Sequence, residues 1–271
     1  LVLIIMPFKL LAHFGVGNFA SWEKGIRQHS EAAVASLMAA AEAVAKQDFR
    51  QADTNFQAAG QGFLAAQAEL GRINDGLLSL AGFSSNPKIK MAAESKKFLA
   101  AGATAASLGR NLVLATDSLF DNSQTDFSVR LDGFLDNGAA AVTDARALQK
   151  TVSGINAANL PPAYRSQFIA LQEQIGSLAD SLGEFVAAGS QLKKLLGLSQ
   201  DKRYLVVFQN NAELRASGGF LGSYALVDVR DGQIKNLEVP AGGSYDTEAG
   251  RRVSVVAPEP LWLVDPLWHF W

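Results

Sequence analysis

The feature that most constrains the fold of this chain is an unbroken run of apolar residues at alternating spacings of three and four. Such spacings place every residue of the run on one face of a single helix, as in a heptad seam. Over the first half of the run, large residues alternate with alanine, so a facing helix can approach closely at each alanine. This first seam consists of Phe49, Ala52, Phe56, Ala59, Phe63, Ala66, Leu70, Ile73, Leu77 and Leu80.

Two more seams follow within residues 20–197, a region that is rich in alanine and poor in β-branched residues, as helices are. Each Phe or Leu buried along a seam contributes about 1.5–3 kcal/mol to stability. One interpretation is a coiled coil that binds a partner; the other, which we favour, is an antiparallel bundle that packs on itself. The second seam consists of Phe127, Leu131, Phe134, Gly138, Ala141, Ala145, Leu148, Val152 and Ile155, and the third of Leu171, Ile175, Leu178, Leu182, Phe185, Gly189, Leu192 and Leu196.

Breaks between the seams predict where the helices begin. The stretch KQDFRQADTNFQAA allows either one continuous helix or a tight turn at Asp48 between paired helices, as in half of a tetratricopeptide repeat. No second copy occurs at that period, so we predict no repeat array. The other predicted starts are Asn86 as N-cap with Pro87 at the first helical position, Thr125 or Asp126 as a cap, and a last long helix after Pro161 and Pro162.

Near residue 200 the pattern changes from helical to strand-like. The runs 203–209 and 220–229 are short, β-rich and apolar, and the first is typical of a buried strand. Asp231-Gly232 then provides a tight turn before residues 233–240, which is the strongest short signal for a hairpin. We therefore predict an α+β chain that is mainly α. A long antiparallel helical bundle or coiled-coil region covers 20–200, and the start of a small, incomplete sheet-containing α/β domain covers 201–271.

Both ends of the sequence are apolar. The opening run LVLIIMPF is shorter than the ~20 residues of a membrane span and is followed by Lys9 and His13. We expect residues 1–19 to be the end of a transmembrane anchor that begins before Leu1; a buried helix and a signal-peptide remnant are the alternatives. The last residues, PLWLVDPLWHFW, form a dense aromatic run that more protein normally covers, so we also expect sequence beyond Trp271.

The composition excludes several classes of site. The chain holds no cysteine, which removes disulfides, thiolate metal sites and cysteine nucleophiles together. The three histidines (His13, His29 and His269) are too scattered for a metal cluster, and we expect neither a metal nor a cofactor. Lys plus Arg is 24 against 26 for Asp plus Glu, and neither part of the chain is basic, so we expect no nucleic-acid partner.

The stretch QNNAELRASGGFLGS, residues 209–223, puts polar residues and glycines between two apolar runs. Asparagines bond locally to backbone, and an arginine either pairs with the nearby glutamate or grips an anion with its two-pronged guanidinium. Glycines let a ligand or another strand come close. Two interpretations of this stretch remain: an ordinary polar connection between strands, or a pocket for a small molecule or a glycan phosphate. On the second interpretation the residues cluster at one end of the sheet, and the binding residues are Asn210, Asn211, Glu213, Arg215, Gly218, Gly219, Gly222 and Ser223.

Two common catalytic motifs are missing from this stretch. It contains no Gly-Lys-Ser/Thr, and its glycines precede a strand rather than a helix, which argues against a phosphate-binding loop of Walker type. It contains no Gly-x-Ser-x-Gly and no neighbouring histidine, which argues against a serine hydrolase. No catalytic residue is assigned.

The run YLVVFQNNAELRASGGFLGSYALVDVRDGQI, together with EPLWLVDPLWHFW, resembles the bacterial membrane-anchored family called domain of unknown function 4012. Members have a transmembrane helix, a helical region and a domain that opens with N-N-x-E-x-R-x-x-G-G-F-x-G-S. The likeness covers about 70 residues here, and the family has no established activity. The resemblance implies a single-pass membrane protein with the bulk of the chain outside the cytoplasm. Its helical spacer would carry a domain that binds a wall polymer or an envelope protein.

A more remote similarity is to LytR–CpsA–Psr enzymes, which attach glycopolymers to the cell wall and grip a lipid pyrophosphate with arginines and aspartates. Arg215 matches one such group. The family's Arg-Ser-Asp is replaced here by ASGGF, and its later Arg-Asp by AGGSYD. A glycopolymer phosphotransferase is therefore the alternative function, and whether the chain is an enzyme stays open.

Overall fold

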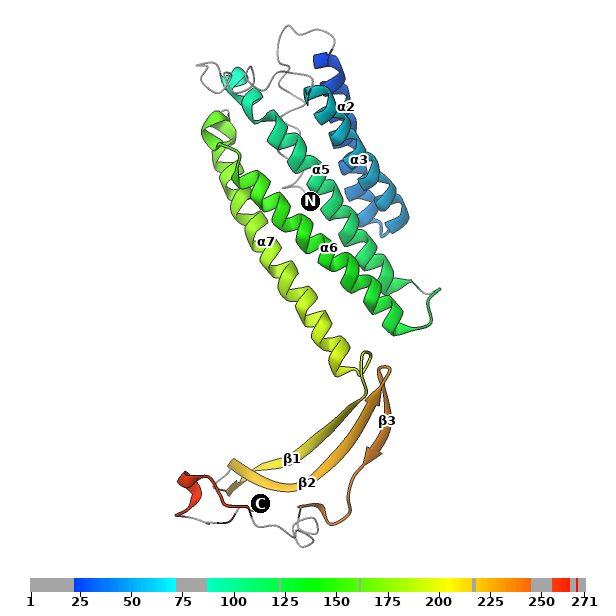
Figure 1. Cartoon of the computed structure of the whole chain (residues 1–271), viewed down its shortest axis with the longest axis vertical. Coiled ribbons are helices and arrows are strands. Elements are labelled where there is room, and N and C mark those ends of the chain that lie inside the picture. Colours follow the sequence, from blue (N-terminus) through cyan, green and yellow to red (C-terminus); the bar gives the residue numbers. More distant parts are fainter. Residues whose placement is uncertain are drawn as a thin grey trace. The chain divides into compact units, whose positions relative to one another are not determined.

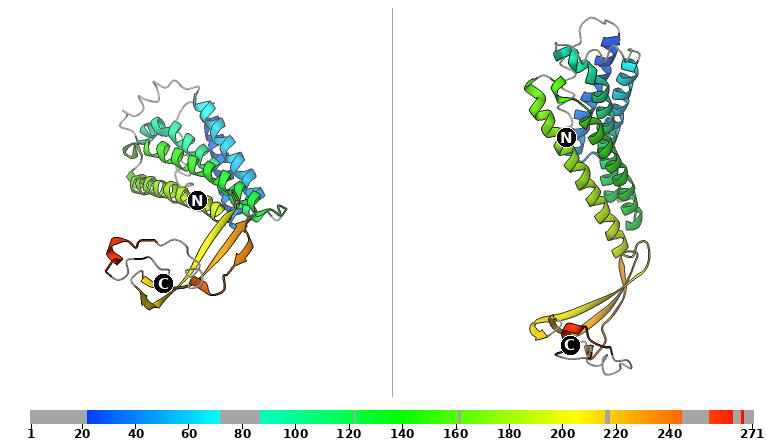
Figure 2. Two further views of the ribbon diagram at one scale, coloured as in Figure 1. Left: turned by 60° about the horizontal axis from the view of Figure 1, so that its bottom comes forward. Right: turned by 60° about the vertical axis from the view of Figure 1, so that its left-hand side comes forward.

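The computed structural model describes residues 22–71, 87–121, 123–160, 162–215, 218–244, 255–263 and 267 (Figures 1 and 2). The chain forms two compact units, Leu1–Ser190 and Gln191–Trp271. The first is helical and the second contains a three-stranded antiparallel sheet, so the predicted α+β class, mainly α, is confirmed. The predicted anchor, residues 1–19, lies outside the described residues.

The helical unit is built from long helices that pack side by side (Figure 1). Helix α2 packs on α3, α3 on α5, and α5 on α6. Helix α7 contacts α6 through Phe134 and Phe185, whose rings meet edge to face at 5.7 Å. The elements are α2 (Trp22–Ala45), α3 (Phe49–Gly71), α5 (Pro87–Phe120), α6 (Phe127–Ser153), the 3₁₀ turn η1 (Ala157–Asn159) and α7 (Pro162–Leu195).

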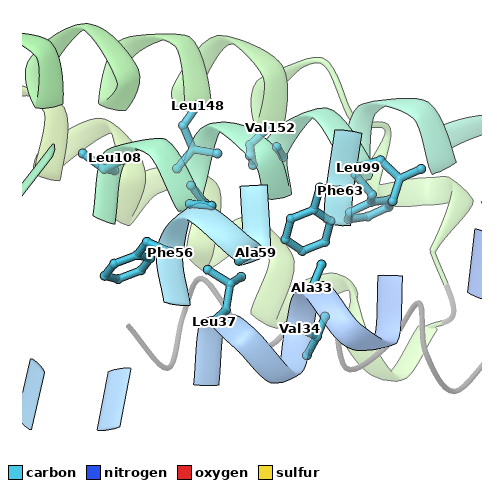
Figure 3. Close-up of a cluster of buried hydrophobic side chains, with 14 of the residues drawn as sticks. Ala33, Val34, Leu37, Phe56, Ala59, Phe63, Leu99, Leu108, Leu148 and Val152 are labelled. Atoms are coloured by element: carbon cyan, nitrogen blue, oxygen red, sulfur yellow. The ribbon is translucent and has the colours of Figure 1, made fainter. Parts of the chain in front are cut away.

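The first seam is the buried face of α3, as predicted. Figure 3 shows Phe56 and Phe63 among buried side chains of the neighbouring helices. A Cβ atom on Gly109 would lie 2.3 Å from the ring of Phe56, and one on Gly102 would lie 2.8 Å from the ring of Phe63. Glycines of α5 therefore make room for the rings of α3. The buried seam residues are Ala52, Phe56, Ala59, Phe63, Ala66 and Leu70, while Ile73, Leu77 and Leu80 lie outside the described residues.

The second seam is also mostly buried, but the third is wrong over its second half. Seven of the nine residues predicted for the second seam are buried, six on α6 and Ile155 just after the helix, whereas Phe127 is 39% exposed. On α7 the buried residues are Phe168, Leu171, Ile175 and Ala179. The predicted Phe185 is 63% exposed and Leu192 is 45% exposed. A straight helix drifts by about 20° per heptad from a strict seven-residue repeat, so Ala179 takes the buried place expected of Leu178. Phe185 still faces Phe134 of α6 but remains largely exposed.

Helix α5 begins at Pro87 as predicted, while its predicted cap, Asn86, lies outside the described residues. The other predicted helix starts are reproduced with one adjustment. The chain turns between α2 and α3, where Gln47 has a φ of 59° and the Asp48 carboxylate accepts a hydrogen bond from the Gln51 amide at 3.0 Å. Of the two candidate caps before α6, Asp126 is the cap and accepts from the Ser128 amide at 2.8 Å. Helix α7 begins at Pro162 itself rather than after it.

Within the described residues, one helical stretch, Glu94–Phe120 of α5, is long and apolar enough by length and composition to cross a membrane. Half of it is buried inside the protein, and the core helix of a soluble protein has the same properties. The stretch is therefore weak evidence for membrane association.

The second unit contains β1 (Lys202–Arg215), β2 (Gly218–Arg230) and β3 (Gln233–Glu238), in the order β1-β2-β3. Asp231 and Gly232 both have positive φ, 53° and 71°, and make the predicted hairpin turn between β2 and β3. Such a turn matches the twist of the two strands that it joins.

Two predictions about the sheet are wrong. Strand β1 does not end near Gln209 but continues to Arg215. Its apolar run is not buried either, since Leu205 is 62% and Phe208 52% exposed, and Ile234 on β3 is 66% exposed. The physical reason is that neither face of β1 is covered in the described part of the chain: Leu205 and Val206 point to opposite faces, and both are exposed.

Candidate functional site

The predicted binding residues lie in strands, at the end of the sheet opposite the Asp231-Gly232 turn (Figure 1). Asn210 pairs with Phe220, and Arg215 pairs with Gly218. The polar stretch is therefore a β-hairpin, whereas the sequence suggested a long connection. Its two connecting residues, 216 and 217, lie outside the described residues.

A bulge shapes this end of β1. The strand register shifts here: Asn210 lies opposite Phe220 and Leu214 opposite Gly219, so three residues of β1 bulge between two neighbouring residues of β2. The side-chain oxygen of Asn210 accepts a hydrogen bond from the Ala212 amide at 3.1 Å. Asparagine favours such local bonds, and extra residues of this kind bend a strand and re-aim its side chains.

Glycine at position 219 allows the bulge to form. A Cβ atom there would lie 2.7 Å from the Asn210 carbonyl oxygen and 3.0 Å from the Asn211 side-chain oxygen. Gly218 has a φ of 119°, which side chains rarely permit, and a Cβ there would lie 3.1 Å from Nε2 of Gln209. The glycine pair thus has a packing role, and it brings Gln209, Asn210 and Asn211 against β2.

The polar side chains at this end differ in exposure. Asn210 and Asn211 are exposed, and Glu213 is half-buried. No cost of burying unsatisfied polar groups therefore arises at the two asparagines. The side chain of Arg215 lies outside the described residues, so its pairing with Glu213 or with an anion stays a prediction.

Gly222 and Ser223 lie further along β2, beside a second register shift opposite Phe208 and Gln209. The turn after β3 packs here: a Cβ atom on Gly243 would lie 2.2 Å from the Gly222 carbonyl oxygen. Ser244 is buried, and among the described residues its hydroxyl has no hydrogen-bond partner. Gln209, Gly243 and Ser244 were not predicted as site residues, although the Gly-Gly-Ser after the third strand was a visible signal.

Charged groups of the sheet pair with one another away from this end. Arg203 donates to both carboxylate oxygens of Asp228, at 2.6 and 2.8 Å, and Arg230 pairs with Asp201. The hydrogen bonds from Arg203 lower the pKa of Asp228 below its ordinary value. The described residues include no group of three histidine, aspartate or glutamate side chains placed to hold a metal ion. The described hairpin end therefore offers mainly neutral amides, which both donate and accept hydrogen bonds.

Comparison with known proteins gives a match over the sheet-containing part of the chain. Residues 199–262 match the family model described as "Protein of unknown function (DUF4012)". No curated protein and no solved structure matches the chain. The likeness to LytR–CpsA–Psr enzymes finds no support in these comparisons and stays a prediction. The sheet-containing part, which includes every predicted binding residue, is thus similar to the family of unknown function 4012.

Proposed function

We propose that this chain is a membrane-anchored protein of the bacterial cell envelope, in which the helical bundle is a spacer and the sheet unit binds a wall polymer. The anchor is the N-terminal apolar run, and the bulk of the chain lies outside the cytoplasm. The family match supports the envelope assignment through the layout of that family. The binding surface is the hairpin end of β1 and β2, which we call the amide end: Gln209, Asn210, Asn211, Glu213, Gly218 and Gly219.

The observation that carries this proposal is the exposure of three adjacent amide side chains where the bulge of β1 begins. Gln209, Asn210 and Asn211 are all exposed, and the close approach of Gly219 keeps Asn210 and Asn211 against β2. Amides donate and accept at once, which suits the hydroxyl and acetamido groups of a glycan. Phe208, 52% exposed and next in the strand, offers an apolar surface for a sugar ring.

The transferase alternative depends on Arg215. It is the only cationic residue between 209 and 223, and a lipid pyrophosphate requires a cation. A protein partner is the other outcome of the test below.

The test is co-sedimentation of the full-length protein with purified cell-wall sacculi. We expect Asn211→Ala to weaken binding by about 2- to 12-fold, the range of one neutral hydrogen bond. Asn236→Ala is the matched control, because it removes an exposed amide from β3 instead. Equal binding by both variants and the parent would contradict the proposal. Sedimentation only after other envelope proteins are added would indicate a protein partner.

Arg215→Lys separates the two functions in the same assay. The change keeps the charge and removes the two-pronged fork. Binding to sacculi that is unchanged in Arg215→Lys supports the neutral-polymer account. A large loss, together with binding of a soluble pyrophosphate by the parent, would favour the transferase.

The proposed location of the chain outside the cytoplasm needs a separate experiment. A reporter that is active only outside the cytoplasm, fused to the C-terminus of the full-length protein, is expected to be active. An inactive reporter, or full-length protein in the soluble cytosolic fraction, would refute the placement.

A further inference from the structure

Helix α7 ends in a regular glycine cap. Gly197 has a φ of 64°, its amide donates to the Lys194 carbonyl at 3.2 Å, and the Leu198 amide donates to the Lys193 carbonyl at 3.2 Å. This is the Schellman arrangement, which uses glycine because other residues resist a left-handed backbone. It leaves the last carbonyls of the helix to find partners elsewhere.

Residues of the sheet supply those partners. The Tyr204 hydroxyl donates to the Leu195 carbonyl at 2.6 Å. The amides of the β2–β3 turn donate next: Gly232 to the Leu196 carbonyl at 2.8 Å, and Asp231 to the Gly197 carbonyl at 3.3 Å. We call these three hydrogen bonds the clasp.

The clasp is closely fitted. A Cβ atom on Gly197 would lie 2.5 Å from the Val229 carbonyl oxygen, so the helix end touches the backbone of β2. Two ion pairs, Arg203–Asp228 and Arg230–Asp201, join the strands beside it. The clasp and the amide end are therefore the two ends of the same pair of strands, β1 and β2.

We propose that the clasp couples the last turn of α7 to the sheet, so that the two open and close as one cooperative unit. Local opening in proteins occurs in such units, and elements that share hydrogen bonds open together. Helix α7 runs without a break from Pro162 to Leu195. A conformational change in the sheet would therefore reach this helix through its last turn. If the sheet binds a wall polymer, the clasp would also transmit that binding to α7, and this role rests on the proposed function. The cooperative opening of the clasp does not depend on the proposed function.

Native-state hydrogen exchange tests the clasp without any ligand. We expect Tyr204→Phe to speed exchange of the Gly232 and Asp231 amides by about 2- to 12-fold, the effect of one neutral hydrogen bond. Gly197→Ala is expected to speed it further, because the new methyl group meets β2. Leu195→Ala is the matched control, since that side chain is 57% exposed and only its carbonyl takes part. The same exchange rate in all four proteins, or unprotected amides in the parent, would overturn the proposal.

A distance measurement checks the same point in a second way. The chain has no cysteine, so Lys194→Cys and Lys235→Cys place two spin labels at defined, exposed positions. One narrow distance distribution is expected in the parent, in Leu195→Ala and in Tyr204→Phe, where one lost hydrogen bond leaves the closed state dominant. A broad distribution is expected in Gly197→Ala, whose new Cβ would lie 2.5 Å from the Val229 carbonyl oxygen. Exchange at Val206 and Val207 reports whether a variant keeps its sheet. A broad distribution in the parent, or a narrow one in Gly197→Ala with the sheet intact, would contradict the clasp.

Adding soluble wall fragments then separates this inference from the proposed function. If the clasp holds and binding at the amide end slows exchange at Gly232, both stand. If the clasp holds and wall fragments do not bind, only the proposed function fails. If wall fragments bind and the clasp variants behave like the parent, only the clasp fails.

Discussion

At the scale of single residues, the closest fits in the helical unit are between aromatic rings and glycines. The rings of Phe56 and Phe63 on α3 lie where α5 has Gly109 and Gly102. Interiors are packed as densely as organic crystals, so an added methyl group must displace something. Gly60 of α3, by contrast, has ordinary space around it, since a Cβ there would meet its nearest neighbour at 3.8 Å.

This contrast gives a matched prediction. Gly109→Ala is expected to destabilise the protein by about 1–3 kcal/mol, because the new Cβ would lie 2.3 Å from the Phe56 ring and overpack the core. Gly60→Ala is expected to stabilise it by about 0.5–1 kcal/mol through helix propensity alone. Chemical denaturation of both variants checks this. A Gly109→Ala protein as stable as the Gly60→Ala protein would show that the ring moves freely.

Gln47 is a second residue whose conformation predicts a result. It holds a left-handed φ of 59° at the end of α2, where glycine is the usual residue. Gln47→Gly is therefore expected to raise the free energy of unfolding by roughly 1 kcal/mol. Gln57→Gly, in the exposed interior of α3, is the control and should lower it by about the same amount. A loss of stability in both variants would rule out strain at Gln47.

The Asp228 carboxyl gives a prediction that depends on pH. Hydrogen bonds from Arg203 lower its pKa below the ordinary 3.8, so the carboxylate stabilises the folded sheet above that value. This stabilisation is lost as the pH falls through the lowered folded pKa, because the unfolded chain then binds the proton more readily. An NMR titration should place the Asp228 midpoint below 3.8, and in Arg203→Gln the midpoint should rise. An unchanged midpoint in that variant would show that Arg203 is not the cause.

At the scale of elements, periodicity predicted the helices and their starts well. The spacing of apolar residues predicted the buried face of α3, and the Asp231-Gly232 dipeptide predicted the hairpin. The spacing failed on α7, because a strict heptad repeat and a 3.6-residue helix diverge with length. The sequence pattern also placed the end of β1 at Gln209. The polar residues after Gln209 resemble a loop, because a bulge that keeps them in the strand cannot be recognised from the sequence.

The divergence on α7 leads to a prediction with paired variants. Ile175 is buried, so Ile175→Ala is expected to cost about 2–4 kcal/mol. Phe185 belongs to the same predicted seam but is 63% exposed, so Phe185→Ala is expected to cost about 1 kcal/mol or less despite the larger side chain. Thermal and chemical unfolding of the two variants provides the comparison. A larger cost at Phe185 would restore the heptad seam as the packed face.

At the scale of the whole molecule, the sequence motif lies in the part of the chain that matches the family model, residues 199–262. The glycine pair was explained only by geometry, since the approach of Gly219 to the Asn210 carbonyl depends on strand register. The exposure of Leu205 and Phe208 was also beyond prediction, because an apolar run does not reveal whether anything covers it. The burial of Ser244 was also beyond prediction, because it depends on how the turn after β3 packs against β2.

Binding of the wall polymer at the amide end can be mapped residue by residue. Hydrogen exchange of the full-length protein is compared with and without soluble wall fragments. Slower exchange is expected at Gln209–Glu213 and at 218–223, with Asn211→Ala reducing the effect and Asn236→Ala leaving it unchanged. Protection confined to the helical unit or to the outer edge of β3, or protection at the amide end that persists in Asn211→Ala, would contradict the proposed binding.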